Sequence, residues 1–76
     1  MQENFSLKLA VINAWNQKKE GDINYSVIAK DLDISRQLVN FNLKTASPSL
    51  TVIRRYANYF GIDLGEFLKM GERLIG

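Results

Sequence analysis

Residues 24–43, NYSVIAKDLDISRQLVNFNL, predict two short helices joined by a tight turn. In the first half, apolar side chains recur at the i, i+3, i+4 and i+7 positions of one helical face, which are Tyr25, Ile28, Ala29 and Leu32. Asn24 stands just before this run, where its side-chain oxygen can accept hydrogen bonds from the first free backbone N–H groups. We therefore expect a helix to begin after Asn24, and the small Ala29 allows a second helix to cross it closely.

The second half of this stretch contains a new helix start at Ser35, after Asp33 and Ile34 interrupt the period. Val39 and Leu43 share one face of the second helix. Its polar side chains point elsewhere, and these are Arg36, Gln37, Asn40 and Lys44. Two helices joined in this way form a helix-turn-helix, a unit that usually places its second helix in the major groove of DNA.

Length and composition exclude several classes of protein. The 76 residues suffice for a single domain, residues 1–76, with one small core. The chain has neither Cys nor His, and the carboxylates of Asp31 and Asp33 alone make no catalytic set, so we expect no enzyme, no metal site, no cofactor and no small-molecule ligand. No apolar run approaches the length of a membrane span and the N-terminus lacks a signal-peptide pattern, which predicts a soluble cytoplasmic protein.

Basic residues concentrate on the second helix of the motif and the segment after it. Residues 34–62 contain four basic side chains and no acidic one, whereas the whole chain has 10 basic and 8 acidic residues. The four are Arg36, Lys44, Arg54 and Arg55. A positive field here suits a phosphate backbone, and the alternative is a chance run in a small protein. We expect Arg54 and Arg55, in the middle of a helix, to form a solvated face.

The rest of the chain predicts three further helices. The first covers about residues 5–19, and Gly21 suits a left-handed cap at its C-terminal end. Its inner face is Leu7, Val11, Ala14 and Trp15, and Ile23 folds back onto the core. After the loop 45–49 with Pro48, a fourth helix repeats Leu50, Ile53, Ala57 and Phe60 as a buried stripe, and Tyr56 and Tyr59 also read as packing residues. Gly61 ends this helix, with Ile62 packed over the cap, and Asp63 with Glu66 starts a fifth helix through about Met70. The expected fold is all-α, with five short helices around one core.

Several residues stand at the spacings of a known family. They are Ile28-Ala29, Leu32-Asp33-Ile34-Ser35, Val39, Pro48-Ser49-Leu50, Ile53, Ala57 and Phe60-Gly61-Ile62. In this combination they resemble the Cro and lambda-repressor type of helix-turn-helix domain, the XRE family, over about residues 23–67. The resemblance implies a compact five-helix, lambda-repressor-like DNA-binding domain with the helix-turn-helix at its second and third helices.

The chain departs from the family pattern in four places. Asp33 fills a turn position usually occupied by Gly and must adopt a left-handed φ. Leu43 replaces a Glu that pairs with an Arg of the first helix, so we expect apolar packing there. Asn42 occupies a normally apolar position, which leaves the rotation of the third helix open. The loop before Pro48 is one residue short, which leaves its phosphate contacts open.

The resemblance implies that bases are read by the first turn of the third helix and by exposed residues one turn later. Those positions are Arg36, Gln37, Asn40 and Phe41. Arg and Gln can each make two hydrogen bonds to a base edge, Asn can reach a base or a phosphate, and Phe can lie against a thymine methyl. The alternatives are a solvated first turn for Arg36 and Gln37 and a core position for Phe41.

Contacts to the DNA backbone are expected around the helix starts and the loop. The candidates are Asn24, Tyr25, Ser35, Lys44, Thr45 and Ser47. For Asn24 and Ser35, helix capping comes first and a phosphate contact would be additional.

Members of this family dimerise on near-palindromic sites, with half-sites about one DNA turn apart. Surplus apolar residues within 64–76 carry our dimer hypothesis, and their alternative is packing onto the core of their own chain. They are Phe67, Leu68, Leu74 and Ile75. The function expected is a small repressor of the phage, plasmid or mobile-element type, with double-stranded DNA and a second copy as partners. The alternative is a protein-interaction module on the same fold, such as the antitoxin of a toxin–antitoxin pair.

Overall fold

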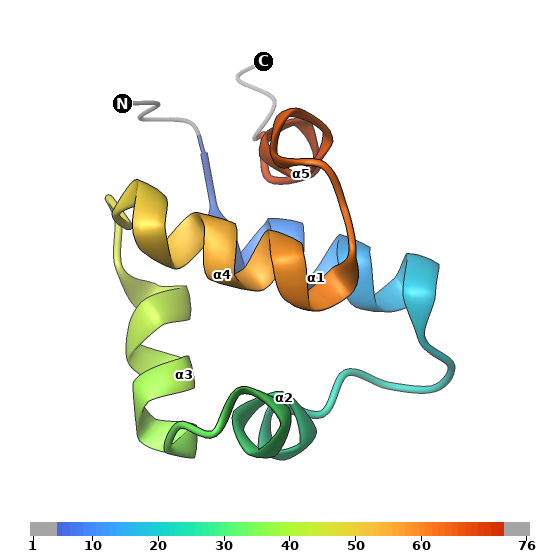
Figure 1. Cartoon of the computed structure of the whole chain (residues 1–76), viewed down its shortest axis with the longest axis vertical. Coiled ribbons are helices and arrows are strands. Elements are labelled where there is room, and N and C mark those ends of the chain that lie inside the picture. The colour runs from blue at the N-terminus through green and yellow to red at the C-terminus, as the bar shows by residue number, and fades with distance from the viewer. Residues whose placement is uncertain (1–4, 73–76) are drawn as a thin grey trace.

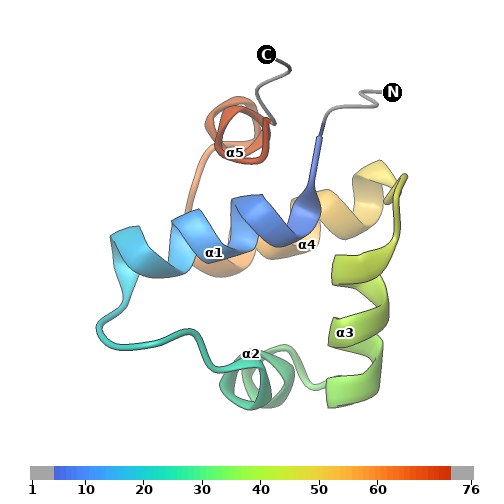
Figure 2. The same ribbon diagram turned by 180° about the vertical axis from the view of Figure 1, so that it is seen from behind.

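The computed structural model describes residues 5–72, which are all-α apart from one isolated antiparallel bridge between Phe5 and Glu72. The helices are α1 (Leu7–Lys18), α2 (Tyr25–Leu32), α3 (Arg36–Lys44), α4 (Leu50–Phe60) and α5 (Leu64–Met70). The predicted five-helix, all-α domain is therefore confirmed. α1 and α4 lie against each other in the middle, α5 covers one end, and α2 and α3 form the opposite end (Figure 1; Figure 2).

The first helix confirms its predicted inner face, because Leu7, Val11, Ala14 and Trp15 are all buried. The prediction that Gly21 caps this helix is wrong. The helix stops at Lys18, followed by Lys19 in an extended conformation, so Gly21 is not its cap although its φ of +80° is left-handed. The Gly21 carbonyl instead accepts a hydrogen bond from the Trp15 indole at 3.1 Å. This bond ties the loop after α1 to the core, and Ile23 packs there as predicted.

The fourth helix buries Ile53, Ala57 and Phe60 as predicted, and its Tyr56 side chain is also fully buried. The prediction that Leu50 is buried is wrong, because 49% of its surface is exposed. α4 begins at Leu50, and helical side chains lean toward the N-terminus, so this side chain extends past the end of the core.

The left-handed Gly61 ends α4 at φ +67°, and the Ile62 N–H returns to the Ala57 carbonyl at 2.9 Å, which confirms the predicted cap.

The fifth helix packs on α1. The Asp63 carboxylate accepts from the Gly65 N–H at its start, and the Asn13 amide donates to the Met70 carbonyl at 2.8 Å at its end. The Phe67 side chain between them is completely buried. Within residues 5–72, no helix has the length and apolar character that crossing a membrane requires.

Candidate nucleic-acid interface

The turn between α2 and α3 consists of residues 33–35, and each of its ends is held by local hydrogen bonds. Asp33 adopts the left-handed conformation that the sequence required, with φ +58°, and its N–H bonds to the Lys30 carbonyl at 3.2 Å. The Ile34 N–H closes the end of α2 onto the Ala29 carbonyl at 3.0 Å. The Ser35 hydroxyl accepts from the Leu38 N–H at 3.0 Å and so caps α3 as predicted. The direction in which α3 leaves the turn is therefore fixed by backbone geometry.

The rotation of α3, which the sequence left open, is set by three buried residues. Val39 and Leu43 face the core, and Asn42 between them is only 6% exposed. The Asn42 side-chain amide donates to the Tyr56 hydroxyl of α4 at 3.1 Å. Burial raises the pKa of that hydroxyl, while the hydrogen bond from Asn42 and the charge of Arg55 lower it by less. The polar Asn42 is thus accommodated in the core because α4 offers it a hydrogen-bond partner.

Opposite this buried face, α3 presents its polar side chains to solvent. Arg36, Gln37 and Lys44 are exposed, and none of them has a hydrogen bond or ion pair within the described residues. Gln37 and Phe41 are four residues apart and so lie side by side on the outer face. Phe41 is 66% exposed, which excludes the core position that the sequence left possible. Whether these side chains contact DNA stays a prediction.

Asn40 lies at one edge of this face and is half-buried. It lines a small hollow together with residues of α1, α2 and α3, which are Lys8, Tyr25, Leu43 and Lys44. The structure thereby brings the predicted Asn40, Tyr25 and Lys44 together. Lys8 was missed, because the sequence of the first helix shows which residues face solvent but not which of them lies beside α3.

The residues predicted to contact the DNA backbone differ in whether their side chains still have a free hydrogen-bond donor. The Asn24 oxygen accepts from the Ser26 and Val27 N–H groups, which leaves the amide nitrogen free to donate. Ser35 accepts in its capping bond and keeps its hydroxyl proton. Thr45 is different, because its hydroxyl already donates its one proton to the Phe41 carbonyl at 2.8 Å. In this arrangement Thr45 cannot also donate to a phosphate.

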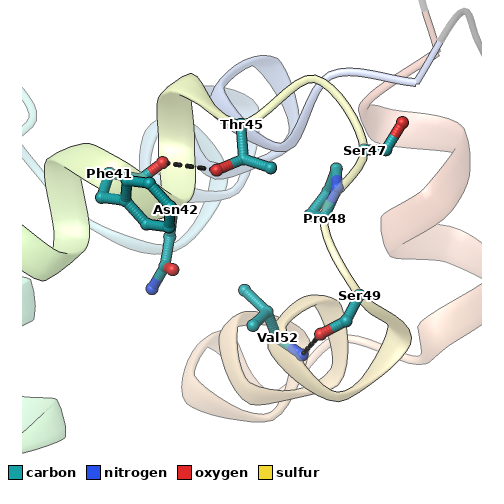
Figure 3. Close-up of a pocket in the computed structure, with 7 residues that line it drawn as sticks. All are labelled: Phe41, Asn42, Thr45, Ser47, Pro48, Ser49 and Val52. Atoms are coloured by element: carbon teal, nitrogen blue, oxygen red, sulfur yellow. Dashed lines mark hydrogen bonds between the residues drawn. The ribbon is translucent and has the colours of Figure 1, made fainter.

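A second hollow, of about 180 Å³, lies between the end of α3 and the start of α4 (Figure 3). Apolar side chains of Phe41, Pro48 and Val52 line it together with the polar residues Asn42, Thr45, Ser47 and Ser49. Ser49 is occupied as the cap of α4, since its hydroxyl accepts from the Val52 N–H at 3.3 Å. Ser47 is exposed, and its hydroxyl points away from Phe41 in Figure 3.

One acidic side chain near α3, Asp31 of α2, is engaged by α4. The Tyr59 hydroxyl of α4 donates to Asp31 of α2 at 2.5 Å. Burial and this carboxylate together raise the pKa of Tyr59 to about 12. The Lys19 ammonium, at the end of α1, stands 5.4 Å from the centre of the Tyr59 ring. Arg54 and Arg55 are exposed on α4, as expected for a solvated face.

The residues chosen for the dimer hypothesis do not form one exposed patch. Phe67 is fully buried and Leu68 is half-buried against the core of its own chain, which is the alternative stated above. Phe67 is therefore not free to contact a second copy in this arrangement. Leu74 and Ile75 lie outside the described residues. Between residues 5 and 72, no three side chains of Asp and Glu gather in a way that could hold a metal ion.

Comparison of this chain with protein-family models, with curated proteins and with solved structures finds no match.

Proposed function

We propose that this chain is a sequence-specific regulator that binds double-stranded DNA and inserts α3 into the major groove. One observation carries the proposal: the first turn of α3 leaves the side chains of Arg36 and Gln37 exposed and unpaired, on a helix whose rotation the core fixes and whose last residue is the exposed Lys44. With nine residues at about 1.5 Å each, α3 is about 13 Å long, and the helix diameter of about 10–12 Å matches the groove width of about 12 Å.

The charges around α3 support this docking. Residues 34–62 carry four basic side chains and no acidic one, and Lys8 of α1 adds a cation beside Asn40 and Lys44. Phosphates that flank the groove would contact Lys8 and Lys44 on one side of α3. Further phosphate contacts would come from Tyr25 and the Asn24 amide at the start of α2 and from Ser35 at the start of α3. Such contacts position the helix, whereas Arg36, Gln37 and Asn40 read base edges.

A single module of this size makes few phosphate contacts, so we propose that it binds as a homodimer on a two-fold symmetric site. As its regulatory role we propose that of a small repressor of the phage, plasmid or mobile-element type, which acts in the cytoplasm. Because Phe67 is buried, the dimer contact must use other residues.

The test is selection of bound duplexes from a random pool, followed by titration of the selected duplex at several salt concentrations. We expect a two-fold symmetric consensus and an affinity that falls steeply with salt. Lys44→Ala should weaken all duplexes alike and reduce the slope of log K against log salt by about 1. Gln37→Ala should cost about 1–3 kcal/mol on the selected duplex only, because it loses base contacts.

A protein-interaction module is the competing function, and exposed apolar side chains favour it. They are Val27, Leu38, Phe41 and Leu50. A module of that kind would select no consensus sequence and would bind every duplex with the same weak affinity. The absence of a consensus, or equal affinity for all duplexes, would refute sequence-specific regulation.

A further inference from the structure

Two apolar side chains lie on the same side of the otherwise polar outer surface of α3. Phe41 is 66% exposed and Leu38, three residues earlier, is 38% exposed; we name these two residues the apolar edge. An exposed Phe is costly in water unless something covers it. The apolar edge is therefore the feature of α3 that hydrogen bonding to bases does not explain.

α3 cannot rotate to bury Phe41, because its opposite face is held in the core. The buried Asn42–Tyr56 hydrogen bond and the buried Val39 and Leu43 hold the opposite face against α4 and the core. The Phe41 carbonyl also accepts from both the Thr45 hydroxyl at 2.8 Å and the Thr45 N–H at 3.1 Å, which secures the last turn of the helix. The ring is thus presented outward one turn after Gln37, at the depth where base edges would lie if α3 occupies the groove.

The floor of the major groove offers one apolar group to such a ring, the C5 methyl of a pyrimidine. We propose that Phe41, with Leu38 beside it, binds this methyl group, so that each half-site requires thymine or 5-methylcytosine next to the base pair read by Gln37. The inference rests on the proposed DNA binding and adds a consequence: methylation of cytosine at that position raises affinity. We commit to DNA as the occupant because Gln37 and Lys44 adjoin Phe41 on the exposed face of α3, and because residues 34–62 carry four basic side chains and no acidic one, a charge that suits phosphates.

The experiment replaces thymine by deoxyuridine, one position at a time, in the duplex selected above. This removes the methyl group and keeps every hydrogen-bonding atom of the base. We expect about a fourfold loss of affinity at one position of each half-site, the value of one buried methyl, and little effect elsewhere. Phe41→Ala should bind the thymine and uridine duplexes equally. Placing cytosine at the same position should weaken binding, and 5-methylcytosine should recover about threefold to fourfold of the loss.

Two control variants test whether the loss of affinity on the uridine duplex depends on Phe41 in particular. Leu50→Ala removes another exposed apolar side chain, outside α3, and should keep the full uridine effect. Gln37→Ala should lose base preference at a neighbouring position and also keep the uridine effect. Since Phe41 and Leu50 are both exposed, neither alanine should lower the melting temperature by more than a few degrees.

The outcomes are distinct from those for the proposed function. Selection of a consensus in which no uridine substitution matters would overturn methyl recognition and leave sequence-specific binding intact. A uridine effect that persists in Phe41→Ala would overturn the assignment to Phe41. If Phe41→Ala instead abolishes self-association while its uridine effect remains, the apolar edge is a protein-binding surface and the inference fails. If the protein binds no duplex in dilute buffer, both the proposed DNA binding and the methyl recognition are refuted.

Discussion

The hydrogen bond between Asn42 and Tyr56 gives the sharpest test of how α3 is held, because both side chains are buried and each satisfies the other. The Asn42 amide is 3.1 Å from the Tyr56 oxygen, and the two residues are 6% and 0% exposed. Tyr56→Phe deletes one oxygen and leaves the Asn42 amide buried without that partner. The free energy of unfolding should fall by about 1–3 kcal/mol, the cost of an unsatisfied buried polar group.

The double variant decides whether the two residues act as a unit. Asn42→Leu alone leaves the Tyr56 hydroxyl without its partner and should also destabilise. Asn42→Leu with Tyr56→Phe replaces both polar groups by apolar ones, so its stability should return to within about 1 kcal/mol of the wild type. The coupling free energy should therefore be at least about 1 kcal/mol.

Urea unfolding monitored by the fluorescence of Trp15, the only tryptophan of the chain, measures all four proteins of this cycle. If the two losses simply add within about 0.5 kcal/mol, the hydrogen bond does not couple α3 to α4, and our account of the rotation of α3 is wrong.

Three further predictions concern single residues. Gly71→Ala would place a Cβ against the Phe5 ring and 2.6 Å from a backbone oxygen, so urea unfolding should show a loss of about 1–3 kcal/mol. Asp33→Gly should raise the thermal midpoint, because glycine adopts the φ of +58° at this position without the roughly 1 kcal/mol strain of a side chain; a lower midpoint would contradict this. The pKa of Tyr59 is about 12 when folded and about 10 when unfolded, so its contribution to stability is complete below about pH 10 and is lost as the pH rises to about 12. Tyr59→Phe, which also removes the bond to Asp31, should show a smaller decline in the urea midpoint between pH 9 and pH 11.5 than the wild type.

Local signals in the sequence were sufficient for the starts of α2, α3 and α5, but Ser6 and Ser49, which cap α1 and α4, were not identified. Asn24, Ser35 and Asp63 cap helices through their own side chains, and Gly61 ends one through a left-handed φ. These interactions involve residues two to five positions apart, so a single stretch of chain determines them. The left-handed Asp33 was predictable for the same reason, because two periodic segments on either side required a tight turn there.

Nonlocal contacts were not predictable in this way. Asn42 is buried only because Tyr56, 14 residues later, supplies a hydroxyl at the right place. Lys8 joins the hollow beside Asn40 because α1 crosses α3, an arrangement that no periodicity within the first helix specifies. Leu50 matched the apolar period but belongs to the first turn of α4, where the core has already ended. Each of these outcomes depends on which helix lies opposite, and a sequence pattern describes one helix at a time.

The polar pair in the core connects stability to base reading. Each residue of a helix is turned by about 100° from the last, so a rotation of α3 by one position would turn Gln37 and Phe41 away from the groove and bring Leu38 toward its centre. Apolar side chains at position 42 would tolerate such a slip, because dispersion and burial have little directional preference, whereas the bond from Asn42 to Tyr56 is satisfied in one rotation only. The Asn42→Leu, Tyr56→Phe double variant should therefore regain stability without regaining full specificity. On the selected duplex it should discriminate single base changes less sharply than the wild type, with an unchanged dependence on salt. Equal discrimination by a stable double variant would show that Val39 and Leu43 alone suffice to orient the helix.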